Sequence, residues 1–201
     1  IKTFTAAVTG CREGKKGLWE VTLDQTAFFP EGGGQPYDTG TLGEARVKEV
    51  HERGEEVIHY TDRPLTVGET VEGAIDWDRR FDNMQGHSGE HIITGCIHRR
   101  FGYDNVGFHM GSEEITIDFN GMITGEELDE MEAEANEAIY RNLPVQILTP
   151  TPEELKDMEY RSKKELTGQV RITVIPGVDV CACCGTHVEH TGEVGLIKVL
   201  G

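Results

Sequence analysis

The stretch His87-Ser88-Gly89-Glu90-His91 places two imidazoles four residues apart, a spacing that stacks them on one face of a helix. A second stretch, Cys183-Cys184-Gly185-Thr186-His187, places a thiol and an imidazole four residues apart. Together they offer His, His, Cys and His, which match zinc in ligand number and chemical type. The alternative is that His87 and His91 are only hydrogen-bonded residues of a half-buried helix. Each pair is a weak motif alone, and their agreement in ligand type favours the metal site.

Length and composition indicate a folded chain of one large domain or two small ones. It has 201 residues, 37% of them hydrophobic, and 25 glycines. The sequence has no apolar run long enough to span a membrane and no signal peptide, so no membrane partner is expected. Five cysteines, three of them within residues 181–184, indicate metal or thiol chemistry in a reducing compartment, and therefore a cytoplasmic protein.

The two ends of the sequence suggest that it was processed or cut from a longer chain. It does not begin with Met. It stops directly after residues 194–200, an apolar stretch that predicts a strand.

Residues 1–77 are predicted to form a small Gly-rich β-barrel or sandwich. Short runs of β-branched and apolar residues recur there without a helical segment, and turn residues separate them. The expected strands are residues 3–8, 17–23, 46–50, 56–60 and 70–75.

A glycine-rich stretch, residues 26–36, lies inside this first domain. Its three consecutive glycines are Gly32, Gly33 and Gly34. They add no side chain to a core and suit a backbone that takes unusual angles or approaches a ligand closely. A flexible surface loop is the alternative, but Phe28 and Phe29 argue against it because two aromatic side chains would anchor the segment. The functional prediction is a ligand-facing loop.

Residues 78–201 are predicted to form an α+β domain. A helix runs from about residue 79 to residue 100, capped by Asp76 or Asp78, and the small residues beside His87 and His91 could let another segment come near. Two Thr-x-x-Glu capping boxes, at residues 124–127 and 151–154, start further helices. The expected strands are residues 106–110, 114–119, 145–148, 170–175, 178–180 and 194–200. This order predicts an α+β sheet with helices on one face.

Three motifs in this order, FFPEGGGQPYDTG, HSGEH and CCGTHVEHTGEVG, resemble the editing domain of alanyl-tRNA synthetase. They resemble even more closely the free-standing alanyl-tRNA editing proteins of the AlaX type, and the resemblance covers nearly the whole chain. It implies a Gly-rich β-barrel followed by the α+β editing core that threonyl- and alanyl-tRNA synthetases share, with a boundary near residue 77. It also implies an activity, the hydrolysis of the ester that wrongly joins Ser, and often Gly, to tRNA(Ala).

The resemblance implies a zinc site and its ligands. By their positions in the motifs these are His87, His91, Cys183 and His187. The family usually has Gly where this chain has Cys184, so the two other thiols nearby, of Cys184 and Cys181, are competitors for the metal. Zinc would either activate the attacking water or hold the amino group of the substrate, and four protein ligands favour the second role.

The resemblance also places residues of the first domain in the substrate pocket. Thr26 corresponds to the family's threonine ahead of the glycine-rich loop and would contact the hydroxyl of Ser. Gln35 follows the glycines, whose backbone would approach the substrate, and it would point into the pocket. An Ala ester would leave Thr26 unpaired, so a preference for Ser over Ala is expected.

The acceptor end of tRNA(Ala) is the implied partner, although a net charge of −17 does not favour phosphate binding. Basic residues could give the acceptor stem a local path, or they could be ordinary solvated side chains. They are Arg79, Arg80, Arg99, Arg100, Arg161, Lys163 and Lys164. A C-terminal domain beyond residue 201 could add tRNA contacts or form a dimer, and the oligomeric state stays open.

Two other functions fit parts of the sequence. HSGEH matches the HxxEH motif of inverted zinc peptidases, in which Glu90 would be the general base. That function gives the glycine-rich loop and the Cys183–His187 segment no role. The other is a structural zinc site in a non-catalytic tRNA-binding module, which a closed set of four ligands would suit.

Overall fold

A computed structural model describes residues 1–111, 113–162 and 168–201. The chain forms two units, residues 1–82 and residues 83–201, each with a hydrophobic core of its own. The boundary between them lies inside α1 (Trp77–Phe101), whereas the sequence prediction placed it at residue 77. The first turn of α1 belongs to the first unit, where the side chain of Arg80 is hydrogen-bonded to Asp38.

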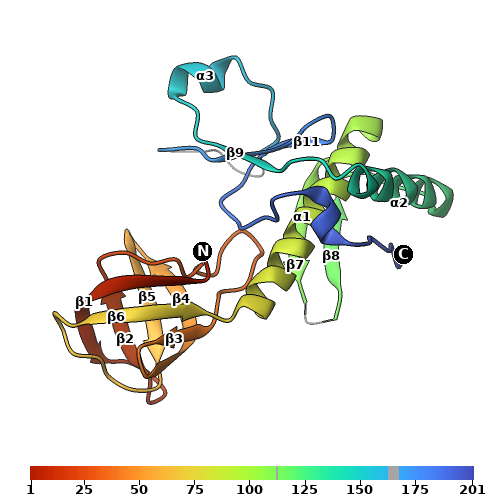
Figure 1. Ribbon diagram of the computed structural model, residues 1–201. Helices are drawn as coiled ribbons and strands as arrows, with labels where there is room; N and C mark the ends of the chain where they lie inside the picture. The colour runs from red at the N-terminus through yellow and green to blue at the C-terminus, as the bar shows by residue number, and fades with distance from the viewer. Residues whose placement is uncertain (112, 163–167) are drawn as a thin grey trace. The chain divides into compact units, whose positions relative to one another are not determined.

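The first unit is a closed barrel of six antiparallel strands (Figure 1). The strands are β1 (Thr3–Glu13), β2 (Trp19–Leu23), β3 (Gly40–Leu42), β4 (Ala45–Arg53), β5 (Glu56–Thr61) and β6 (Thr70–Ile75). Around the barrel their order is β1-β2-β5-β4-β3-β6, and the pairing of β6 with β1 closes it. The predicted barrel is confirmed. The sequence analysis missed only β3, whose 3 residues are too few for a visible alternation of apolar and polar side chains.

A β-bulge in β4 explains how this strand fills the barrel core. Val47 and Val50 are both fully buried, although residues three apart point to opposite faces of a regular strand. The register of β4 against β5 shifts between Val47 and Glu49, and the extra residue returns Val50 to the inner face. Both valines therefore join the same core cluster as Val21 and Leu42.

The glycine-rich loop makes a tight turn at its tip. Gly32 and Gln35 exchange two backbone hydrogen bonds of 3.1 and 3.0 Å, and Gly33 and Gly34 between them have φ of 62° and 89°. Residues with a side chain rarely adopt positive φ at two successive positions, so the turn requires glycine. The predicted unusual backbone angles are confirmed, and Phe28 anchors the loop in the barrel core as expected.

The second unit combines two long helices with two small antiparallel sheets. After α1, its elements are β7 (Asn105–Met110), β8 (Ile115–Phe119), α2 (Gly125–Tyr140), β9 (Gln146–Leu148), α3 (Pro152–Lys156), β10 (Ile172–Ile175), β11 (Asp179–Ala182) and the 3-10 helix η1 (Thr191–Val194). β7 and β8 form a hairpin, and the other strands form a three-stranded sheet in the order β11-β10-β9. The α+β class is confirmed, with two sheets in place of the single sheet expected. Both capping boxes are present, at Thr124 and Thr151.

One core joins α1 and α2 to the three-stranded sheet of the second unit. Ile92 and Ile97 of α1 share this core with Met131 and Ala135 of α2 and with Ile175 of β10. Within the described ranges, no helix has the length and apolar character needed to cross a membrane.

Gly95 on α1 lets a neighbouring segment approach the helix closely. A Cβ atom on Gly95 would lie 2.8 Å from the Cβ of Asp179, and nearer still to the carbonyl oxygen of Val178. The turn between β10 and β11 therefore packs directly on the backbone of α1. This contact brings Asp179 to the side of His91, to which it is hydrogen-bonded.

The predicted strand over residues 194–200 is wrong. The chain forms η1 there and then continues to its end without regular structure. The N–H of Ile197 donates to Oδ1 of Asn136 (2.9 Å), and the N–H of Val199 donates to Oε2 of Glu132 (2.6 Å). Side chains of α2 therefore take the place of a partner strand, and an apolar sequence pattern cannot reveal such partners.

Replacing Gly95 by Val should destabilise the second unit, because the new side chain cannot fit against the turn between β10 and β11. Overpacking of this kind costs about 1–3 kcal/mol, and the free energy of unfolding measured in urea should fall by that amount. Gly125→Ala is the matched control, since a Cβ on Gly125 meets nothing within 4 Å. If Gly95→Val is as stable as the wild type, the turn does not press on the helix.

Candidate metal centre

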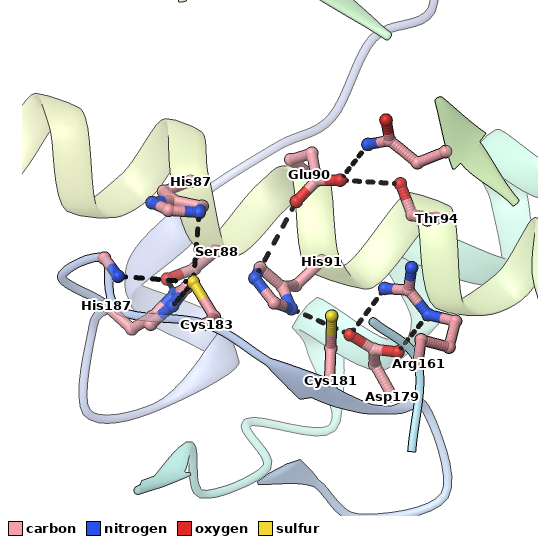
Figure 2. A network of polar contacts seen from close by, with 12 residues as sticks. His87, Ser88, Glu90, His91, Thr94, Arg161, Asp179, Cys181, Cys183 and His187 are labelled. Carbon is pink, nitrogen blue, oxygen red and sulfur yellow. Dashed lines mark hydrogen bonds and ion pairs between the residues drawn. The ribbon is translucent and has the colours of Figure 1, made fainter. Parts of the chain in front are cut away.

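Four side chains of the second unit converge on one point (Figure 2). His87 and His91 project from α1, and Cys183 and His187 come from the loop that follows β11. Their ligand atoms lie within 4.8 Å of one another, and Sγ of Cys183 is 3.4 Å from Nε2 of both His87 and His187. Tetrahedral zinc with bonds of about 2.0–2.3 Å needs ligand separations of about 3.3–3.8 Å. The cluster therefore has nearly the size that the ion requires.

Asp179 fixes the ring of His91. Nδ1 of His91 is 2.8 Å from Oδ2 of Asp179, and Arg161 donates two hydrogen bonds of 2.8 and 2.9 Å to the same carboxylate. Burial opposes the ionisation of Asp179, but its bonds to His91 and Arg161 outweigh burial and lower its pKa. The carboxylate therefore accepts from Nδ1–H and leaves Nε2 to a metal, as is usual around ligating histidines.

The sequence analysis missed Asp179, although a signal was present. A lone carboxylate stands between Val178 and Val180 in an apolar strand, and a buried carboxylate needs a partner. The identity of the partner could not be found in the same way, because His91 is 88 positions away along the chain.

Ser88 supports His187 in the way that Asp179 supports His91. Oγ of Ser88 is 3.2 Å from Nδ1 of His187 and accepts a 3.1 Å hydrogen bond from the N–H of Val188. Ser88 is fully buried on α1. It therefore links the helix that carries two of the candidate ligands to the loop that carries the others.

Arg171 shapes the loop that contains Cys183. Its guanidinium donates to the carbonyl oxygens of Cys183 (3.0 Å) and Gly185 (2.6 Å). The N–H of Gly185 in turn donates to Sγ of Cys183 over 3.3 Å. A hydrogen bond to the sulfur stabilises its thiolate form, which is the form that binds metal.

The pKa shifts of Cys183 and His187 favour metal binding, whereas His91 would have to lose a proton. Burial disfavours the thiolate of Cys183, but its contacts with the three histidines lower its pKa to about 2. Burial lowers the pKa of His187 to about 4, so this imidazole is neutral. Burial also disfavours the charged form of His91, yet hydrogen bonds to Asp179 and Cys183 raise its pKa to about 10. A metal at Nε2 of His91 would therefore displace a proton.

The two other thiols near the cluster are poorer ligands than Cys183. Cys181 lies close to His91 and Asp179, but burial raises the pKa of its thiol to about 12. The carboxylate of Asp179 is moreover already bonded to Arg161. Cys184 is exposed, and among the described residues it belongs to no group of converging metal ligands.

Glu90, the candidate base of an HxxEH peptidase, is 3% exposed and has partners inside the second unit. Its Oε1 accepts a 3.1 Å hydrogen bond from Thr94 (Figure 2) and a second bond from the side-chain amide of Asn105. Its Oε2 lies 3.8 Å from Nε2 of His91. A general base needs its carboxylate beside the substrate, so these partners argue against the peptidase mechanism.

The candidate pocket residues Thr26 and Gln35 belong to the barrel unit. Oγ1 of Thr26 is 2.8 Å from Nε2 of His59 and accepts a 3.1 Å hydrogen bond from the N–H of Phe28. Gln35 is fully buried at the end of the glycine turn, whereas the three glycines of the turn are exposed. Thr26 itself is half-buried.

Arg79 and Arg80 have different environments within the barrel unit. Arg80 is 8% exposed and forms an ion pair with Asp38, and it also donates to the carbonyl oxygen of Ala27 over 2.7 Å. It therefore joins both sides of the glycine-rich loop to the first turn of α1. Arg79 is exposed, and its Nε donates to the carbonyl oxygen of Tyr37 over 3.2 Å.

The other basic residues proposed for a tRNA path are occupied or outside the described residues. Arg99 and Arg100 form ion pairs with glutamates of α2, and Arg161 holds the carboxylate described above. Lys163 and Lys164 lie outside the described residues.

Comparisons with known proteins place the chain beside alanyl-tRNA editing proteins. Residues 2–79 match the family model of class II (A) tRNA synthetases, and residues 170–201 match the second additional domain of threonyl and alanyl tRNA synthetases. The whole chain is 35% identical to the alanyl-tRNA editing protein Aarsd1 of Bos taurus and covers 49% of it. It is 34% identical to the alanyl-tRNA editing protein AlaX-L of Pyrococcus horikoshii and to the alanine–tRNA ligase of Ignicoccus hospitalis, covering 52% and 23% of them. The chain thus spans about half the length of the editing proteins that it matches.

Replacing Asp179 by Asn should weaken metal binding by about 10- to 100-fold, because the partner of a ligating histidine sets its orientation and basicity. Competition with a zinc-binding dye measures the dissociation constant, and circular dichroism checks that the variant is folded. Asp157→Asn is the matched control, since Asp157 is exposed at the end of α3. Unchanged affinity in a folded Asp179→Asn variant would contradict the role assigned to this carboxylate.

Proposed function

We propose that the chain, which is 35% identical to Aarsd1 and 34% identical to AlaX-L over about half of their length, hydrolyses the ester between tRNA(Ala) and a wrongly attached amino acid. Serine is the proposed amino acid, with glycine as a second one. The observation that carries the proposal is the buried cluster of His87, His91, Cys183 and His187, which unites metal-binding side chains from distant parts of the chain.

Zinc is the ion proposed for this cluster. One thiolate and three imidazoles form a donor set of intermediate softness, which zinc prefers over magnesium or calcium. Bound there, zinc would supply Lewis-acid chemistry, either toward the attacking water or as a holder of the substrate amino group. A set of four protein ligands favours the holding role, because catalytic zinc sites usually keep one position open.

The residues of the barrel unit would recognise the amino acid and the end of the tRNA. An aminoacyl ester is already activated, so its hydrolysis depends mainly on a positioned water and a stabilised oxyanion. Thr26 would contact the hydroxyl of Ser, and Gln35 is the second proposed pocket residue. The exposed turn of Gly32, Gly33 and Gly34 would let the substrate approach the backbone closely.

Arg79 is the proposed phosphate contact near the barrel, because its side chain is exposed. Arg80 was expected to bind the substrate directly, but we propose an indirect role for it. Its ion pair with Asp38 is buried, so it would position the glycine-rich loop on which the substrate contacts lie. One exposed arginine does not offset a net charge of −17, and a single phosphate contact should make binding of the acceptor end depend only weakly on salt.

A structural zinc site in a tRNA-binding module is the second candidate. The observation in its favour is the same closed set of four protein ligands. Such a module would bind tRNA(Ala) without releasing the amino acid, so a deacylation assay distinguishes the two functions.

Replacing Thr26 by Val should lower the preference for seryl-tRNA(Ala) over alanyl-tRNA(Ala), because the variant has no hydroxyl to pair with that of Ser. A lost hydrogen bond of this kind corresponds to about a 5- to 10-fold lower ratio of kcat/KM values for the two substrates. Deacylation of both aminoacyl-tRNAs with radiolabelled amino acids measures this ratio.

Two controls separate recognition from folding in this experiment. Thr26→Ser retains a hydroxyl and should retain the preference, while Thr66→Val changes an exposed threonine of the same unit and should have no effect. An unchanged ratio in Thr26→Val would remove Thr26 from the substrate contacts.

A further inference from the structure

A chain of hydrogen bonds in the barrel unit fixes the direction of the Thr26 hydroxyl. The first of these hydrogen bonds involves Val21 on β2, whose carbonyl oxygen is 3.1 Å from Nδ1 of His59 on β5. A carbonyl oxygen can only accept a hydrogen bond, so Nδ1 of His59 carries a proton. This contact therefore fixes a proton on Nδ1.

The other ring nitrogen of His59 is consequently an acceptor. His59 is fully buried, and burial lowers its pKa to about 4, so the ring is neutral at neutral pH. With the proton on Nδ1, Nε2 presents a lone pair. Oγ1 of Thr26 lies 2.8 Å from Nε2, and the hydroxyl hydrogen of Thr26 therefore points at His59.

Oγ1 of Thr26 has one lone pair left that can accept a further hydrogen bond. One of its two lone pairs accepts the 3.1 Å hydrogen bond from the N–H of Phe28. The remaining lone pair can accept a hydrogen bond, and no hydrogen is left for Thr26 to donate. A serine side chain can donate to that lone pair, whereas the methyl group of alanine and the hydrogen of glycine cannot.

We propose that His59 is a positioning residue that makes Thr26 an acceptor-only contact, so that the chain prefers a β-hydroxy amino acid over glycine as well as over alanine. His59 touches no substrate and acts through Thr26. The inference rests on the proposed deacylase function and adds to it the ranking of serine above glycine. It also gives a chemical reason for a buried histidine in a barrel core that is otherwise largely aliphatic.

The test measures how two substitutions of His59 change the hydrolysis of seryl and glycyl esters of adenosine. These substrates contain no tRNA, so their hydrolysis does not depend on tRNA binding. His59→Gln can still accept from Thr26 through its side-chain oxygen and should keep the serine-to-glycine ratio of kcat/KM within about twofold of wild type. His59→Met has similar bulk but only a weak acceptor, so the Thr26 hydroxyl is free to rotate. Its ratio should fall by about 5- to 10-fold, the effect of one lost hydrogen bond.

Two further measurements exclude a merely structural effect. Val71→Ala removes volume from the same barrel core on β6 and should lower stability without changing the ratio. The double variant His59→Met, Thr26→Val should show no larger loss of the ratio than Thr26→Val alone, because both changes remove the same contact. Nitrogen-15 NMR of the imidazole in the wild type should show one neutral tautomer, protonated at Nδ1.

The outcomes separate this inference from the proposed function. If the wild type hydrolyses neither ester, the deacylase function fails and the inference fails with it. If the wild type hydrolyses the seryl ester and a folded His59→Met keeps the same ratio, only the role of His59 is overturned. A protonated Nε2 in the NMR spectrum, or additive losses in the double variant, would likewise overturn it.

Discussion

The hydrogen bond between His91 and Asp179 is the contact on which the metal centre depends. It joins α1 to β11 and, together with the bonds of Ser88 to the following loop, brings two ligands of the helix to two ligands of that loop. The carboxylate is buried, so it must be fully paired, and Arg161 completes its pairing. Gly95 makes the approach sterically feasible, because any larger side chain would meet the turn before β11. The protein fold therefore holds the ligands in place, because α1 and β11 are bonded to each other and Gly95 lets them lie close together.

The barrel unit also depends on a buried charged pair, formed by Asp38 and Arg80. Asp38 and Arg80 are both buried, and their ion pair holds the glycine-rich loop against the first turn of α1. Breaking such a pair by removing one partner costs about 3–5 kcal/mol, because the other charge stays buried without compensation. The loop thus combines a rigid base with an exposed turn whose two positive φ values only glycine accepts readily. A substrate contact on this loop would be presented by a fixed backbone.

Much of the fold and of the ligand cluster could be predicted from the sequence, because these features depend on residues that are close together along the chain. The barrel strands alternate apolar and polar residues, both capping boxes have their Thr and Glu at fixed spacing, and His87 and His91 are one helical turn apart. What could not be predicted depends on contacts between distant residues. The strand expected at residues 194–200 failed because Asn136 and Glu132 satisfy its backbone instead. Asp179 and His59 escaped notice because each is bonded to a partner on another element, and the buried pairing of Arg80 with Asp38 could not be foreseen for the same reason.

The cluster of four ligands is proposed to serve hydrolysis and not only folding. The most direct test removes the metal with a chelator and measures two properties of the same sample, hydrolysis of a seryl ester of adenosine and the free energy of unfolding in urea. A functional site predicts that hydrolysis stops, that the chain stays folded, and that added zinc restores the activity. Full hydrolysis by a metal-free, folded chain would contradict this claim, and unfolding on chelation would make the site structural.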